Sequence, residues 1–225
     1  PVTVPLDPQL NAQENAKRYF DRYQKLKRTA EALNEQTARV RLDIEHLESM
    51  EQALSIARTE ADLKDLREEL ALTGYAGKPK QNDKKSRERK EKSSPLHYRT
   101  KDDFDGKGPY DLYVGKNNLQ NDFLTFKFAN GGDWWFHSKT IHGSHVILRT
   151  GDQPTDAIPD HVYELAAALA AYYSQGKEQT LVDVDYVRRK EVKKPAGAHP
   201  GYVVYYTNYS MSVRPDISEL TLIDS

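Results

Sequence analysis

Apolar and small side chains recur at alternating steps of three and four residues through the first part of this chain, residues 10–73. This spacing is typical of the a/d seam of a left-handed coiled coil, in which one face of a helix is apolar. It predicts a long helical arm, for which Asp7-Pro8 offers an N-cap and a proline in the first turn. The seam consists of Ala16, Tyr19, Tyr23, Leu26, Ala30, Leu33, Val40, Ile44, Leu47 and Leu54, with Thr37 and Glu51 in the same series.

The helical pattern is interrupted near Arg58-Thr59, and a shorter helix is expected over residues 60–73. Gly74 follows at the position after a helix end, where a left-handed backbone is common. One helix cannot bury its own apolar seam, so the seam must meet a second helix. That helix is the short one that follows, another copy of the chain, or an upstream segment, and we favour the upstream segment. Residues 1–75 are therefore expected to form an incomplete coiled-coil arm.

A basic linker is expected over residues 76–109. Between residues 78 and 101 the chain has ten lysines and arginines and three acidic residues, a net charge of +7. Stretches rich in Lys, Ser and Pro with few apolar residues remain disordered and often contact nucleic acid. A soluble tether without a binding role is the alternative.

A compact α/β domain is expected over residues 110–225. Pro159–Ser174 has the apolar spacing of an amphipathic helix, and another helix is expected to begin around Asn118. The fold class of the whole chain is therefore α+β: a long helical arm followed by a compact domain with a mixed, largely antiparallel sheet. Runs of β-branched and aromatic residues predict strands near residues 111–114, 133–138, 144–149, 181–187, 202–206 and 210–213.

Residues 116–121, which we call the amide segment, carry a lysine and several side-chain amides directly after an apolar run. Buried amides cost free energy unless they are hydrogen-bonded, so this composition indicates a surface for a polar, anionic partner. Lys116 would pair with a phosphate, and the amides would contact sugar or base edges. For any single Asn, capping of the next helix is the alternative. The amides are those of Asn117, Asn118, Gln120 and Asn121.

Aromatic and histidine side chains follow on the next two expected strands. Strand alternation places Trp135 in the core and leaves Trp134 either in the core or exposed, where it would stack on a base. The three histidines of this stretch have neither a carboxylate nor a cysteine at a known ligand spacing, so we expect hydrogen-bonding groups and no metal site. The residues expected to contact RNA here are Trp134, His137, Lys139, Ser144 and His145.

A second basic stretch, residues 188–194, is called the basic loop below. It has five cations against Glu191 and is followed by prolines and glycines. Beside the amide segment, it would complete one continuous anion-facing surface; a solvated turn is the alternative. Asp183 and Asp185 alternate nearby, where they could hold Mg²⁺ but are better explained by pairing with these cations. The cations are Arg188, Arg189, Lys190, Lys193 and Lys194.

Composition excludes several classes of protein. The chain has no cysteine, which excludes a disulfide framework, thiolate metal sites and a thiol nucleophile. It has neither an apolar run of membrane-spanning length nor a signal-peptide pattern at its start, so a cytoplasmic location is expected for what reads as an excised fragment. Neither a Ser-His-Asp order nor paired carboxylates stand out, so no catalysis and no cofactor are expected.

Several long motifs together resemble the C-terminal NFACT-R domain of the RqcH family, whose members are also named fibronectin-binding proteins A or streptococcal adherence and virulence factors A. The early LDPQLNAQENAKRYFDRYQKLK and ELALTGY resemble the end of that family's coiled-coil middle region. The motifs of the NFACT-R part are VGKNNLQNDFLTFKFA, DWWFHSKTIHGSHVIL, LAAALAAYYS, VDVDYVRRKEVKKPAGAHPG and VVYYTNYSMSVRP.

This resemblance implies a non-enzymatic RNA- and ribosome-binding part of a ribosome-associated quality-control factor. Full-length bacterial members bind obstructed large ribosomal subunits and recruit alanyl-tRNA, so that the stalled peptide receives a C-terminal alanine tail. The coiled coil is implied to reach the stalk base of the subunit, and the implied partners are the large subunit and tRNA, with no membrane. The family's N-terminal tRNA-selecting domain has no counterpart in these residues.

Two other functions remain open at this point. The family's older name suggests a fibronectin-binding adhesin, exposed at the cell surface without a signal peptide. A nuclease that uses Asp183, Asp185 and His137 is a weaker option.

Overall fold

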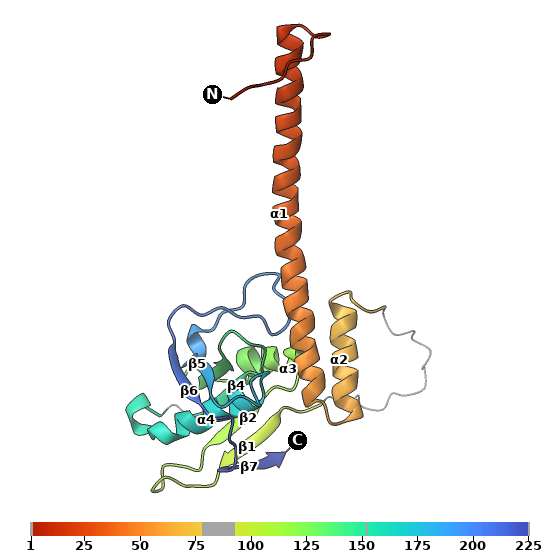
Figure 1. The fold of residues 1–225 in the computed structure, drawn as a ribbon. Helices are drawn as coiled ribbons and strands as arrows, with labels where there is room; N and C mark the ends of the chain where they lie inside the picture. The colour runs from red at the N-terminus through yellow and green to blue at the C-terminus, as the bar shows by residue number, and fades with distance from the viewer. Residues whose placement is uncertain (1, 78–92, 152, 225) are drawn as a thin grey trace. The chain divides into compact units, whose positions relative to one another are not determined.

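The computed structural model describes residues 2–77, 93–151 and 153–224 (Figure 1). The basic residues expected as a linker between 78 and 92 lie outside these ranges. Contacts divide the chain into two units, Pro1–His46 and Leu47–Ser225, and the division falls within the first helix. The elements are α1 (Ala12–Ile56), α2 (Glu60–Leu72), β1 (Leu96–Thr100), β2 (Asp111–Val114), α3 (Asn118–Phe123), a π-helical turn (Leu124–Phe128), β3 (Trp134–Ser138), β4 (Val146–Arg149), α4 (Asp160–Tyr172), β5 (Val182–Arg188), β6 (Tyr209–Val213) and β7 (Leu220–Asp224).

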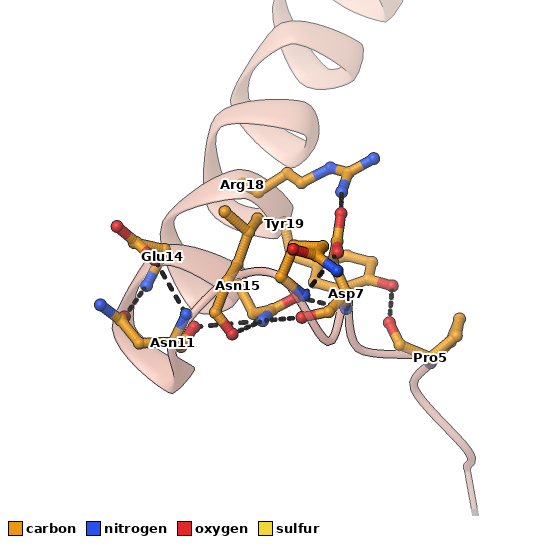
Figure 2. A network of polar contacts seen from close by, with 9 residues as sticks. Pro5, Asp7, Asn11, Glu14, Asn15, Arg18 and Tyr19 are labelled. Carbon is orange, nitrogen blue, oxygen red and sulfur yellow. Dashed lines mark hydrogen bonds and ion pairs between the residues drawn. The ribbon is translucent and has the colours of Figure 1, made fainter.

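The first unit contains the start of α1, which polar side chains fix at Ala12 (Figure 2). Asn11 Oδ1 accepts a hydrogen bond from the Glu14 backbone N–H at 2.8 Å, and Glu14 Oε2 accepts one from the Asn11 N–H at 2.8 Å, which is a reciprocal capping box. The cap expected at Asp7 is therefore wrong. Asp7 belongs to the preceding turn, where its N–H donates to Oδ1 of the buried Asn15 at 2.8 Å.

The seam of α1 in this unit faces solvent. Leu26 and Leu33 are each 60% exposed, and Tyr23 is 58% exposed. The predicted long helix is confirmed. Its pairing with a second helix stays a prediction.

In the second unit, the end of α1 packs against α2. Met50, Ala53 and Leu66 form a small buried cluster between the two helices. The predicted break is confirmed, because Thr59 caps α2 through a capping box with Asp62. After α2, the chain turns at Gly74, as expected, with φ +85°.

The core of the second unit is a seven-stranded sheet in the order β6-β5-β3-β4-β2-β1-β7. Each neighbouring pair of strands is antiparallel, so the α+β class is confirmed, whereas the parallel component of the expected mixed sheet is wrong. β1 lies within the range expected as a linker and pairs with β2 on one side and β7 on the other. Of the expected strands, 202–206 forms none in the described chain, where Val204 only makes an isolated bridge to Lys193.

The two faces of the sheet bury different side chains. On one face, α4 packs its alanine-rich surface against Trp134, Phe136 and their neighbours. On the other face, Trp135 and Ile147 pack against the π-helical turn and the segment that follows β5. Trp134 and Trp135 lie on opposite faces of the sheet, so the predicted alternation is confirmed. They are only 3% and 1% exposed, so the exposed position considered for Trp134 is wrong. The second face carries the candidate interface.

Candidate nucleic-acid interface

The amide segment is buried, which corrects the expectation of an exposed surface. Its lysine, Lys116, is 5% exposed and places Nζ 2.6 Å from Oδ1 of Asp62 on α2. Burial by itself would raise the pKa of Asp62, but hydrogen bonds from Lys116, from Ser93 and from two backbone N–H groups outweigh burial and hold this pKa well below its usual range. Since both groups are buried and paired, Lys116 has a structural role here and no free charge for a phosphate.

Two of the amides shape the turn into α3. Asn117 caps the helix by accepting from the Gln120 N–H at 2.9 Å, the capping role considered for a single Asn. Gln120 Oε1 accepts from the Lys116 N–H at 3.0 Å, and its Nε2 donates to the Ser93 carbonyl at 2.9 Å. These amides therefore satisfy backbone groups of the turn itself.

Asn118 joins α3 to the helices of the same unit. Its Nδ2 donates to Ser49 Oγ at 2.8 Å and to Glu69 Oε1 at 2.9 Å. Glu69 is completely buried, and this burial raises its pKa from the ordinary 4.5 to about 7, in spite of the hydrogen bonds from Asn118. The last amide, Asn121, accepts from the backbone N–H of His145 at 3.0 Å. The segment thus connects α3 to Glu69 of α2, to Ser49 near the end of α1 and to His145 directly before β4.

The histidines of the second face are neutral packing groups. His145 is 2% exposed and lies 2.8 Å from Thr125 Oγ1 through Nδ1, and burial holds its pKa well below the usual range. His137 stacks on Trp135 with ring centres 5.7 Å apart, and burial lowers its pKa to about 4. Ser144 is also buried. In the ranges that the structure describes, no group of three His, Asp or Glu side chains could hold a metal ion.

Lys139 is the exposed member of this stretch. It is 47% exposed, with Nζ 3.8 Å from Oδ1 of Asp185. Asp185 also accepts from the hydroxyls of Tyr205 at 2.9 Å and Ser210 at 2.5 Å. The partners of the Asp185 carboxylate are thus Lys139 and two hydroxyl groups, and the pairing expected between Asp185 and the basic loop is wrong.

The basic loop is more exposed than the amide segment, and its cations differ in freedom. Arg188 and Arg189 are half-buried, and Lys194 forms an ion pair with Asp122. Lys190 and Lys193 are exposed, and among the described residues neither has an ion-pair partner. Two lysines are thus available to an anionic partner.

The chain that follows the basic loop lies over the amide segment. The N–H of Gly201 donates to Asp122 Oδ1 at 3.1 Å. Gly201 has φ +80°, and a Cβ there would lie 2.4 Å from Oδ1 of Asn118, so only glycine permits this close approach. The chain after the basic loop therefore covers the buried amide segment, and the single continuous surface expected from sequence is wrong.

Two half-buried arginines lie on aromatic rings, an arrangement that the sequence did not indicate, and one of them, Arg149, also pairs with Asp133. The Arg189 guanidinium lies 5.3 Å from the ring centre of Phe126, and that of Arg149 lies 4.9 Å from Phe128. Both rings belong to the π-helical turn. Arg149 is the last residue of the apolar strand β4, and this position was the only feature of the sequence that could have indicated a role for it. Proteins that bind single strands commonly use aromatic rings on which bases stack and arginines that add cation–π contacts.

Among the helices that the structure describes, none has the length and apolar character needed to span a membrane.

Two family models match this chain. Residues 1–89 match the family of NFACT N-terminal and middle domains, and residues 96–206 match the NFACT protein RNA binding domain.

Two curated relatives align with nearly the whole of this chain. The chain is 39% identical over 220 residues to the Rqc2 homolog RqcH of Streptococcus pneumoniae, covering 98% of this chain and 37% of that protein. It is 36% identical over 215 residues to the Rqc2 homolog RqcH of Bacillus subtilis, covering 96% of this chain and 35% of that protein. The chain thus spans little more than a third of the length of these relatives.

A solved structure has the same fold. The C-terminal part of the fibronectin/fibrinogen-binding protein from Streptococcus suis superposes with a TM-score of 0.77 at 38% identity, covering 93% of this chain and 78% of that one. The matched families, the identities and the shared fold agree. The chain belongs to the RqcH family and corresponds to its C-terminal region, the end of the NFACT middle domain followed by the NFACT-R domain.

Proposed function

We propose that residues 96–206 bind RNA through the basic loop, as part of a ribosome-associated quality-control factor. The match to the NFACT RNA binding domain and the likeness to RqcH proteins support this proposal. The observation that carries it is the pair of exposed lysines, Lys190 and Lys193, in the same loop as Arg189, whose guanidinium lies on the ring of Phe126 in the π-helical turn. Phosphates would lie on the lysines, and neutralising them would release counterions.

In the full-length protein, this region would help to bind obstructed large ribosomal subunits and tRNA. Alanyl-tRNA would be recruited there for C-terminal alanine tailing of the stalled peptide, a role that needs the whole protein. The arm would reach the stalk base, and the exposed seam of α1 would pair with a helix from an upstream segment. This function places the protein in the cytoplasm and assigns neither a catalytic step nor a cofactor to this chain.

The test is tRNA binding by the double variant Lys190→Ala/Lys193→Ala. Fluorescence anisotropy across a series of salt concentrations should show weaker binding, and the slope of log Kd against log salt should become shallower by about 1.5, since two phosphate contacts are lost. A matched variant, Lys107→Ala/Lys177→Ala, removes the same charge from two other exposed positions of the domain. It should leave the slope within about 0.5 of the parent value.

Three outcomes separate the possibilities. A parent chain that binds no tRNA at low salt would reject RNA binding altogether. If the parent binds but both double variants behave alike, the basic loop is the wrong place. Surface plasmon resonance on immobilised fibronectin examines the second candidate, which the name of the Streptococcus suis protein favours; tight, salt-insensitive fibronectin binding without tRNA binding would support an adhesin.

A further inference from the structure

A cleft of about 820 Å³ opens where β5 ends, beside the edge strand β6. Its walls come from the turn before β3, the segment after β4, the end of β5 and the start of β6. This volume is in the usual range for sites that hold a small ligand, about 300–1,000 Å³. Among the lining residues are Trp134, Thr155, Arg188, Lys190, Glu191 and Tyr209.

Tyr209 offers an aromatic face in this cleft. It is 61% exposed, although one side of its ring stacks on Tyr186 with ring centres 5.4 Å apart. The ring also lies 6.1 Å from that of the buried Trp134. These contacts hold Tyr209 in place and leave much of it free, which is the arrangement of a stacking platform for a base.

Two cations lie beside this platform. The Arg188 guanidinium sits 4.4 Å from the ring centre of Trp134, and its Nη2 donates to Thr155 Oγ1 at 2.5 Å. It also donates to the carbonyl of Gly132, so the group is fixed in orientation before any ligand arrives. Lys190 is exposed and reaches the same cleft from the basic loop. Both can contact a phosphate.

A carboxylate limits what the cleft accepts. Glu191 also lines it, so a compact ligand that carries only negative charge would meet repulsion on that side. A nucleotide can contact both the cations and the carboxylate, because its phosphate can lie near Arg188 and Lys190 while an exocyclic amino group of the base donates to Glu191. The cleft therefore fits a nucleotide better than a free anion.

We propose that this cleft binds one unstacked nucleotide of a single-stranded RNA, with the base on Tyr209 and the phosphate on Lys190 and Arg188. The inference rests on the proposed RNA binding and deepens it by naming the form of RNA and its contact. Single-stranded RNA is favoured over a duplex because only an unpaired base can turn its face to an aromatic ring.

The experiment measures the binding of a fluorescein-labelled oligoadenylate RNA of about eight nucleotides to the full chain by anisotropy. Tyr209→Ala should weaken binding about tenfold, and Tyr209→Phe, which keeps the ring, should stay within about twofold of the parent. The matched control is Tyr206→Ala, because Tyr206 is 83% exposed but does not line the cleft. Thermal unfolding of each variant establishes that the fold is kept.

The inference is overturned if Tyr209→Ala binds within about twofold of the parent, or if Tyr206→Ala loses as much affinity as Tyr209→Ala. Should Tyr209→Ala fail to fold, Lys190→Ala decides instead: about a threefold loss of oligoadenylate affinity is expected, and an unchanged Kd rejects the cleft. A parent chain that binds tRNA but not oligoadenylate rejects this inference and leaves the proposed function standing. A parent that binds neither rejects both.

Discussion

The amide segment (116–121) and the basic loop (188–194) are both short, polar and cationic, and the chain that follows the loop covers the segment. In the amide segment, the lysine and the four amides are between 2% and 6% exposed. In the basic loop, Lys190 and Lys193 are exposed. The difference comes from partners: α2 supplies Asp62 and Glu69 to the amide segment, whereas the two lysines of the loop have no described counter-charge. Polar composition therefore marks a binding surface only where the fold leaves the groups unsatisfied.

The largest effect is expected at the buried ion pair. Lys116→Met leaves Asp62 without its buried cation and should lower the free energy of unfolding by about 3–5 kcal/mol, measured by urea denaturation. The control is Lys139→Met, which removes an exposed lysine 3.8 Å from a carboxylate and should change stability by less than about 1 kcal/mol. Equal losses in the two variants would mean that the amide segment is not buried as described.

The next effect depends on pH. The pKa of Glu69 is raised to about 7 in the fold, so the folded state holds a proton that the unfolded chain releases near 4.5. The contribution of Glu69 to the free energy of unfolding is therefore fully present below about pH 4.5 and is lost as the pH rises to about 7, a change of about 3 kcal/mol. Glu69→Gln keeps the amide contact and should remove this decline. Denaturation curves at pH 5 and pH 8 measure the fall in the free energy of unfolding between the two pH values. If this free energy falls as much in Glu69→Gln as in the parent, the prediction is contradicted.

A smaller loss is expected for a single amide. Gln120→Ala leaves the Lys116 N–H and the Ser93 carbonyl without their partner and should cost about 1–3 kcal/mol. Asn208→Ala is the matched control, because Asn208 is exposed and its contacts are local. A thermal melt in which the control is as destabilised as Gln120→Ala would weaken the contrast between buried and exposed amides.

The smallest effect on stability belongs to the basic loop. Lys190→Ala/Lys193→Ala, the variant expected to lose tRNA affinity, should unfold within about 0.5 kcal/mol of the parent in urea. A loss of several kcal/mol would mean that these lysines stabilise the fold, and the proposed contrast between the two segments would fail.

Much of the fold could be predicted from the sequence because periodic apolar patterns report burial directly. The helix break at Thr59, the turn at Gly74 and the amphipathic α4 were all recognisable from local residues. β1 was not, because its residues follow a strongly basic stretch and the strand is defined by pairing with β2 and β7. Strands of this kind depend on distant partners that no local pattern reveals.

The candidate site was harder to predict for the same reason. From the sequence, Lys116 and Lys190 were both expected to contact an anionic partner. In the structure, Lys116 pairs with Asp62, which lies more than fifty residues earlier, whereas Lys190 is exposed to solvent. Tyr209 was also not foreseen, since an alternating strand shows which residues share a face but not whether a face at the sheet edge stays open.

The most direct test of the central claim is cross-linking of the folded chain to RNA that contains 4-thiouridine, with the modified peptides identified by mass spectrometry. Cross-links on peptides that include residues 188–194 or Tyr209, and none on the peptide that contains residues 116–121, are the result expected from the burial of one segment and the exposure of the other. Cross-links concentrated on residues 116–121 would contradict the account.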